Sequence, residues 1–107
     1  MKPRAVITGV GVVSPFGVGT ERFWDALAAG ASAVGPIRSF DASCFPTRVA
    51  GEVPVAHTSA AWMREHQPES AHAESFSAWE GQGMLRDRKV AFGVLAALEA
   101  WRSAGCE

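Results

Sequence analysis

The segment from Arg4 to Val13 constrains the fold of this chain more than any other feature. It is rich in β-branched residues, and its apolar positions barely alternate with polar ones. This pattern is typical of a strand that is covered on both faces, as in a parallel sheet. One such strand cannot satisfy its own backbone N–H and C=O groups. The sequence therefore predicts an α/β fold in which this strand needs neighbours.

Two helices are predicted on either side of a turn-rich middle. Thr20 is a candidate N-cap for the first helix, which Gly30 would end. The second helix runs from about Leu85 to Ala104, with Gly105 as its C-cap. Its apolar arc is unusually broad and leaves only a few residues, such as Glu99, for an exposed face. A helix of this kind requires packing partners on more than one side.

The middle of the chain adds little to a sheet. Residues Arg48 to Val53 predict a second extended segment. From Pro54 to Gly83 the composition shifts to Ala, Ser, His and Glu without a sustained period, which favours a loop or short-helix excursion outside the core. One strong strand, one weak strand and two helices do not complete a sheet. The pattern indicates one unit over residues 1–107 that is part of something larger.

The four tryptophans divide into two pairs. Trp24 and Trp101 lie on the apolar faces of the predicted helices, so we expect both in the core. Trp62 and Trp79 lie in the 54–83 excursion and could cover a hydrophobic surface or meet a partner. The sequence alone does not decide between these two roles.

Charge and cysteine content exclude several classes of function. Ten Lys and Arg residues against eleven Asp and Glu give a net charge of −1, so we expect no nucleic-acid binding. No apolar stretch approaches membrane-spanning length, so we expect no membrane insertion. Cys44 and Cys106 have neither disulfide-framework nor zinc-ligand spacing, which fits a reducing cytoplasm.

Candidate chemical motifs are weak. Gly9 and Gly11 approximate a dinucleotide-binding GxGxxG motif, but Ser14 replaces the third glycine. Nucleotide binding is therefore a minor alternative to a packing role for the glycines.

The histidines and cysteines show no catalytic or metal-ligand pattern. His57, His66 and His72 lack a metal-ligand spacing, and we interpret them as solvated loop residues. Cys44 lies in a turn and Cys106 follows a helix C-terminus, where a thiolate is not stabilised. We assign no catalytic, cofactor-binding or metal-binding residue and expect no cofactor.

The order and spacing of several motifs nevertheless resemble one family, the 3-oxoacyl-acyl-carrier-protein synthases, or β-ketoacyl synthases. The stretches that carry the resemblance are Val6–Gly17, Phe23–Trp24, Gly35–Ile37, Phe40–Ser43, Phe45–Val53, Asp87–Arg88 and Ala104–Gly105. Residues 54–83 break the pattern, and we interpret them as an insertion in a surface cap, since loop insertions cost little stability.

The resemblance implies the N-terminal part of a thiolase-like layered α/β fold, from a condensing enzyme of fatty-acid or polyketide synthesis. Such enzymes accept an acyl group from acyl carrier protein on a cysteine at a helix N-terminus. Two histidines then assist decarboxylation of malonyl-acyl-carrier protein and Claisen condensation. Cys44, Cys106 and the three histidines do not match the family's catalytic motifs, so we expect this chain to be inactive alone.

The resemblance also implies acyl carrier protein as a partner and dimerisation with a synthase subunit. The alternative from another class is a non-catalytic interaction module that pairs with a full-length synthase subunit. The broad apolar surface of residues 85–104 motivates it.

Overall fold

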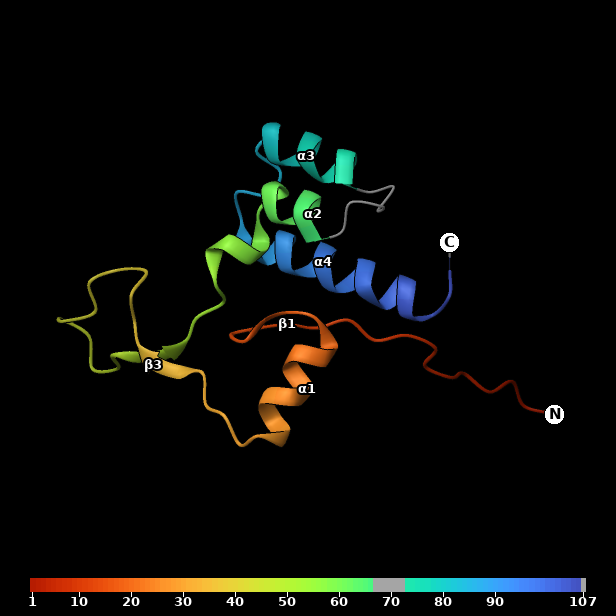
Figure 1. Cartoon of the computed structure of the whole chain (residues 1–107), viewed down its shortest axis with the longest axis horizontal. Coiled ribbons are helices and arrows are strands. Elements are labelled where there is room, and N and C mark those ends of the chain that lie inside the picture. Colours follow the sequence, from red (N-terminus) through yellow and green to blue (C-terminus); the bar gives the residue numbers. More distant parts are fainter. Residues whose placement is uncertain (67–72, 107) are drawn as a thin grey trace.

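The computed structural model describes residues 1–66 and 73–106. Here the chain forms a small mixed assembly of helices and short strands, consistent with part of an α/β domain (Figure 1). The elements are β1 (Val13–Ser14), β2 (Gly17–Val18), α1 (Thr20–Ala28), β3 (Val34–Pro36), β4 (Val49–Gly51), the 3₁₀ helix η1 (Val55–Thr58), α2 (Ala60–His66), α3 (Ala73–Gly81) and α4 (Arg88–Ser103).

The strand predicted over Arg4 to Val13 is not formed as such. Only Val13 of this segment lies in a strand, and residues 4–12 run as an extended trace beside α4 (Figure 1). β1 turns back into β2, with Val13 opposite Val18 in an antiparallel pair. The long strand is absent because the described residues provide no parallel neighbour for residues 4–12 to bond with.

Helix α1 begins and ends near the predicted positions, but its apolar face is uncovered. Gly19 is the N-cap, and Thr20 is the first helical residue instead of the predicted cap. Gly30 follows the helix with a φ of 67°, as expected for a residue that ends a helix. Trp24 is 68% exposed and Trp101 of α4 is 57% exposed, so the prediction that both lie in the core is wrong. Both tryptophans are thus more exposed than covered in the described structure.

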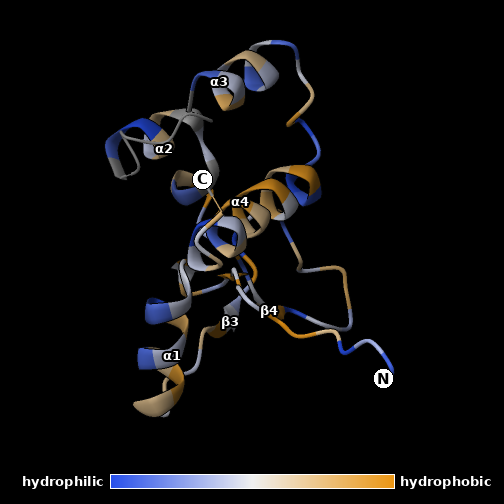
Figure 2. Cartoon of the chain, turned by 90° about the vertical axis from the view of Figure 1, so that its right-hand side faces the viewer, coloured by the Kyte–Doolittle hydropathy of each residue, from blue (hydrophilic) through white to orange (hydrophobic). Residues whose placement is uncertain are grey.

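The hydrophobic core is centred on α4. In Figures 1 and 2, α4 lies between the α2–α3 pair and the N-terminal segment with α1. Ala91 and Leu95 of α4 pack in one cluster with Val18, Met63 of α2 and Phe76 of α3. The partly buried residues packed around this cluster are Val13, Trp62, Leu85, Val94 and Leu98.

The excursion at residues 54–83 therefore contributes to the core. Met63 and Phe76 are fully buried, so the prediction that this stretch lies outside the core is wrong. Each lies on a helix too short for its apolar spacing to stand out in the sequence, since α2 has 7 residues and α3 has 9. Together they cover one side of α4, the helix that was predicted to need several partners.

Gly9 and Gly11 bring the N-terminal segment into direct contact with the backbone of α4. A Cβ atom on Gly9 would overlap the carbonyl oxygen of Ala100, and one on Gly11 would overlap that of Ala96. Glycine is required at both positions because any side chain would push the segment away from the helix. This gives the glycines a packing role.

Glu99 links three parts of the chain. Its Oε1 accepts hydrogen bonds from the backbone N–H of Thr20 at 2.6 Å and from Thr20 Oγ1 at 2.8 Å. Its Oε2 accepts from the N–H of Val12 at 2.7 Å. Glu99 is half-buried, so its assignment to an exposed face is wrong. One carboxylate on α4 thus fixes both the N-terminal segment and the start of α1.

The chain is open for its size. Its radius of gyration is 16.3 Å, whereas a compact domain of this length has about 13 Å. Its accessible surface is 7824 Å², against about 5,700 Å² for a compact monomer of this mass. Figure 2 shows hydrophobic residues along both α4 and the N-terminal segment that passes beside it. None of the helices in the described ranges is long and apolar enough to cross a bilayer.

We predict opposite effects for two Gly-to-Ala substitutions. Gly11→Ala should lower the free energy of unfolding by about 2 kcal/mol, because the added Cβ cannot fit against Ala96. Gly93→Ala, on α4 with no atom near its added Cβ, should raise it by about 0.5–1 kcal/mol. Urea denaturation followed by circular dichroism measures both. Equal effects of the two substitutions would contradict the close contact.

Removal of the Glu99 carboxylate should destabilise the chain through its lost hydrogen bonds. We expect Glu99→Ala to lower the free energy of unfolding by about 2 kcal/mol, because the amides of Val12 and Thr20 lose a charged acceptor. Glu65→Ala, at an exposed position on α2, is the control and should change it by less than about 0.5 kcal/mol. A Glu99→Ala effect no larger than that of Glu65→Ala would disprove the role of Glu99.

Candidate functional site

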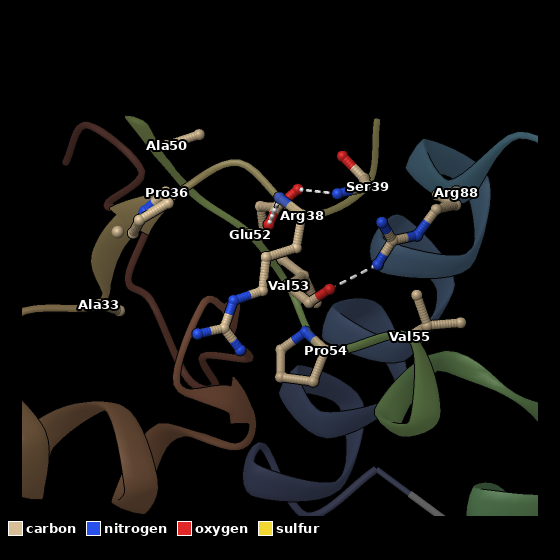
Figure 3. A pocket seen from close by; sticks show the side chains of 11 residues that line it. Ala33, Pro36, Arg38, Ser39, Ala50, Glu52, Val53, Pro54, Val55 and Arg88 are labelled. Atoms are coloured by element: carbon tan, nitrogen blue, oxygen red, sulfur yellow. Dashed lines mark hydrogen bonds between the residues drawn. The ribbon is translucent and has the colours of Figure 1, made fainter. Parts of the chain in front are cut away.

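A groove of about 460 Å³ lies where the β3–β4 hairpin meets the start of α4 (Figure 3). The two strands pair antiparallel, with Gly35 opposite Ala50, and β4 falls within the extended segment predicted at residues 48–53. The residues that line the groove are Ala33, Gly35, Pro36, Arg38, Ser39, Ala50, Glu52, Val53, Pro54, Val55 and Arg88. Its walls are polar and apolar in about equal parts, with two guanidinium groups and one carboxylate as the charged groups.

Arg88 joins the helix to the segment that follows β4. It is the first residue of α4, after Asp87, whose side chain caps the helix by accepting from the N–H of Lys89. Arg88 Nη2 donates to the carbonyl oxygen of Val53 at 2.6 Å, and the guanidinium lies 5.1 Å from the centroid of the Phe92 ring. Its Nε is buried without a hydrogen-bond partner in the described structure. The side chain is therefore fixed, and its buried Nε–H is an unused donor.

Glu52 closes the base of the β3–β4 hairpin. Its carboxylate accepts from the backbone N–H of Arg38 at 2.9 Å and of Ser39 at 3.0 Å. The pKa of Glu52 is lowered from its ordinary value, first by a hydrogen bond from the Ser39 side chain and then by these two backbone amides. The Arg38 charge lowers the pKa further. Glu52 is thus held as a carboxylate by its local bonds.

The charged groups of the groove can bind and position polar atoms. Figure 3 shows the guanidinium groups of Arg38 and Arg88 on either side of Val53. The lining contains no cysteine or histidine, and the carboxylate beside the Ser39 hydroxyl is that of Glu52, whose pKa is lowered. The groove is best described as a joint between the hairpin and α4.

The cysteines and histidines noted in the sequence do not converge. Cys44 and Cys106 are exposed free thiols, one in the β3–β4 loop and one after α4. His66 is the last residue of α2, and His72 lies outside the described residues. Within residues 1–66 and 73–106, no group of three or more His, Cys, Asp or Glu side chains could hold a metal ion.

The sequence analysis interpreted His57 as a solvated loop residue, and this interpretation is wrong. His57 is half-buried, and its ring centroid lies 5.8 Å from that of Trp62. Its Nδ1 is buried without a hydrogen-bond partner in the part of the chain that the structure describes. A Cβ on Gly17 would come within 2.5 Å of this nitrogen. His57 therefore packs between β2 and α2, where the absence of a Gly17 side chain makes room for it.

Sequence reasoning missed the polar residues that organise this region. Arg88, Glu52 and Glu99 each bond to the backbone of a distant segment, which is a tertiary contact without a short motif. The one sequence signal that could have indicated such a residue is a charged side chain among the apolar residues of a helix. Glu99 has this signal, because it lies between Leu98 and Trp101 on the most apolar helix of the chain.

Comparison with known proteins gives matches along the whole chain. Residues 2–107 match the family model described as beta-ketoacyl synthase, N-terminal domain. The "Granaticin polyketide putative beta-ketoacyl synthase 1" of Streptomyces violaceoruber is 41% identical over 107 residues, which are 100% of this chain and 22% of that protein. The "3-oxoacyl-[acyl-carrier-protein] synthase 2" of Coxiella burnetii is 60% identical over 52 residues, 49% of this chain and 13% of that protein.

A third relative is named as a subunit. The "Tetracenomycin polyketide synthase ketoacyl synthase alpha subunit" of Streptomyces glaucescens is 52% identical over 50 residues, 47% of this chain and 12% of that protein. No solved structure matches the chain. This chain thus spans less than a quarter of the length of these three relatives.

The hydrogen bonds at Glu52 predict a specific pH response. Its lowered pKa means that its contribution to stability is present above the unfolded-state pKa and is lost as the pH falls through the folded-state pKa. Ser39→Ala should raise the pKa of Glu52 toward its ordinary value in a carboxyl NMR titration. Ser43→Ala is the matched control, because Ser43 instead bonds to Asp41 and lowers that pKa. An unchanged Glu52 pKa in Ser39→Ala would contradict this assignment.

Proposed function

Because this chain belongs to the β-ketoacyl synthase family, we propose that it is the N-terminal part of a condensing enzyme of fatty-acid or polyketide synthesis. The observation that carries the proposal is the family match over residues 2–107, with 41% identity to one relative along the whole chain. The chain covers 22% of that relative. We propose that the catalytic groups of the complete enzyme lie in the larger part that has no counterpart here.

The proposed reaction has two stages, both inferred from the family. An acyl group moves from acyl carrier protein to a cysteine thiolate, and the resulting thioester then condenses with the carbanion formed by decarboxylation of malonyl-acyl-carrier protein. A helix N-terminus or a nearby cation stabilises a thiolate by lowering the pKa of its thiol. Cys44 and Cys106 are exposed and lie in a loop and after a helix C-terminus. Neither is proposed as the nucleophile.

The role of this chain is then architectural, within a thiolase-like layered fold. Support comes from its open shape, with 7824 Å² of accessible surface and hydrophobic residues on the outside of both α1 and α4. Helix α4 provides the rigid element, since Glu99 fixes the N-terminal segment and Arg88 fixes the hairpin. The groove beside Arg88 would be a joint within the larger enzyme.

Residues 54–83 remain proposed as an insertion relative to the family. Several relatives align over only 50–52 residues, with identities of 46–60%. Identity over the full chain is lower, at 41% for the granaticin synthase 1. Such a difference fits a chain with one family-like half and one divergent stretch. Met63 and Phe76 would then give this insertion its own contact with α4.

A second candidate function is a non-catalytic module that pairs with a synthase subunit. The name of the tetracenomycin relative, an alpha subunit, favours pairing between chains of this family. Exposed Trp24, Leu27 and Trp101 provide apolar area for such a partner. Acyl carrier protein is proposed as a partner of the complete enzyme only.

A chimeric enzyme tests the proposed function. The chain alone, supplied with acyl- and malonyl-acyl-carrier protein, should form no condensation product. A granaticin synthase 1 whose matched N-terminal 22% is replaced by this chain should retain condensation, while the same synthase with that part deleted should lose it. Product formation is measured by mass spectrometry of the carrier protein.

Two results would count against the proposal. Turnover by the 107-residue chain alone would place the active centre within it. An inactive chimera that folds and dimerises like the parent synthase would favour the non-catalytic module instead.

A further inference from the structure

The groove between the β3–β4 hairpin and α4 is short of hydrogen-bond acceptors. Arg88 Nη2 bonds to the carbonyl oxygen of Val53 at 2.6 Å, but the buried Nε–H of Arg88 has no partner in the described structure. Within residues 1–66 and 73–106, the guanidinium group of Arg38 is attracted to Glu52 but makes no hydrogen bond. A guanidinium group carries five N–H donors. Both arginines of the groove therefore retain donors for a ligand.

The carboxylate of the groove is already occupied by the hairpin. Glu52 Oε2 accepts from the N–H of Arg38 at 2.9 Å, and its Oε1 accepts from the N–H of Ser39 at 3.0 Å. The Ser39 hydroxyl adds a further hydrogen bond and lowers the pKa of Glu52. Glu52 is thus held in its charged form. Two guanidinium groups and one carboxylate leave the lining with a net positive charge of one.

The remaining lining is mostly aliphatic. The volume of about 460 Å³ lies within the range of roughly 300–1,000 Å³ that is usual for small-molecule sites. The apolar side chains that line it are Ala33, Pro36, Ala50, Val53, Pro54 and Val55. Such a lining fits a ligand with one charged end and a short apolar body.

We propose that this groove binds a small organic monocarboxylate. Its carboxylate is bound by the guanidinium groups of Arg38 and Arg88, which Figure 3 shows on either side of Val53. Its apolar body lies against Pro54 and Val55. The planar fork of a guanidinium matches the two oxygens of a carboxylate, and such charge-assisted bonds are stronger than neutral ones. The site is separate from the condensation proposed above and does not depend on it.

A phosphate dianion is the less suitable ligand. It brings a second negative charge, which the lining does not balance and which Glu52 repels. Phosphate is commonly held by backbone N–H groups, either in a loop or at a helix N-terminus. Here the N–H groups of Arg38 and Ser39 are bonded to Glu52, and Asp87 accepts from the N–H of Lys89 at the start of α4. These backbone donors are therefore already in use.

An NMR titration of the 107-residue chain with sodium hexanoate tests the site. We expect saturable shifts of the Arg88 Nε–H and the Val53 amide, with a Kd on the order of 1 mM for so small a ligand. Hexan-1-ol lacks the charge and acetate lacks the apolar body, so each should bind at least about tenfold more weakly. Inorganic phosphate should also bind more weakly than hexanoate.

A matched pair of arginine variants locates the carboxylate. Arg38→Gln removes a guanidinium group from the groove and should weaken hexanoate binding at least about fivefold. Arg48→Gln is the control with the same loss of charge. Arg48 is exposed, lies on the same hairpin outside the lining and donates through Nε to the carbonyl oxygen of Phe45. We expect this control to change binding less than about twofold. Arg88 is retained in both variants because its bond to Val53 fixes the hairpin.

Several results would overturn this assignment. Equal losses in Arg38→Gln and Arg48→Gln would show attraction to the charge of the whole chain, and hexan-1-ol that binds as tightly as hexanoate would show an apolar contact only. Phosphate that binds as tightly as hexanoate would contradict the monocarboxylate class. Absence of saturable shifts at the groove would contradict the site itself. The chimeric synthase tests condensation separately, since its activity does not depend on a ligand in this groove.

Discussion

The fold of this chain depends on the contact between helix α4 and the N-terminal segment. Glu99 provides its polar part, because one half-buried carboxylate accepts three hydrogen bonds from Val12 and Thr20. Charged acceptors bonded to backbone amides are among the stronger polar contacts in proteins. Gly9 and Gly11 provide the close approach that places Val12 within reach. Without this contact, the segment and α1 would have little to hold them to the rest of the chain.

Helix α4 organises both ends of the molecule through different chemistry. At its N-terminus, Arg88 binds the carbonyl of Val53 and so fixes the chain after β4. A positive charge at a helix N-terminus is unfavourable for the helix dipole. Asp87, the N-cap, places a carboxylate beside it, and the Phe92 ring supports the guanidinium. The polar groups of α4 thus serve tertiary connections, while Ala91 and Leu95 serve the core.

The sequence predicted the positions of α1, α4 and β4 well, because apolar spacing and glycine positions within each segment determine these elements. The spacing of apolar residues and the glycines at positions 30 and 105 located α1 and α4, and β4 lies within its predicted extended segment. The strand at residues 4–13 was not formed, since strand pairing depends on neighbours that local sequence does not supply. Trp24 is exposed for the same reason. It lies on the apolar face of α1, and the described chain leaves most of its side chain uncovered.

The candidate site was less predictable than the fold. Glu52, Arg88 and Glu99 act through bonds to backbone groups that are 13 to 87 residues away in sequence. No spacing rule links such partners, so a single sequence cannot reveal them. The excursion at 54–83 was misjudged because its two short helices give one buried residue each, Met63 and Phe76. The family resemblance, by contrast, was confirmed over residues 2–107 because it rests on many short motifs in order.

The contact of Gly9 and Gly11 with Ala100 and Ala96 has a consequence for how the segment threads past the helix. Two residues of an extended chain advance about 6.6 Å, and four residues of an α-helix advance about 6.0 Å. The two glycines therefore match two successive turns of α4. A slip of two residues would place Ile7 or Val13 where only glycine fits. The register of the N-terminal segment along α4 is consequently unique, and the main-chain geometry at the two glycines sets it.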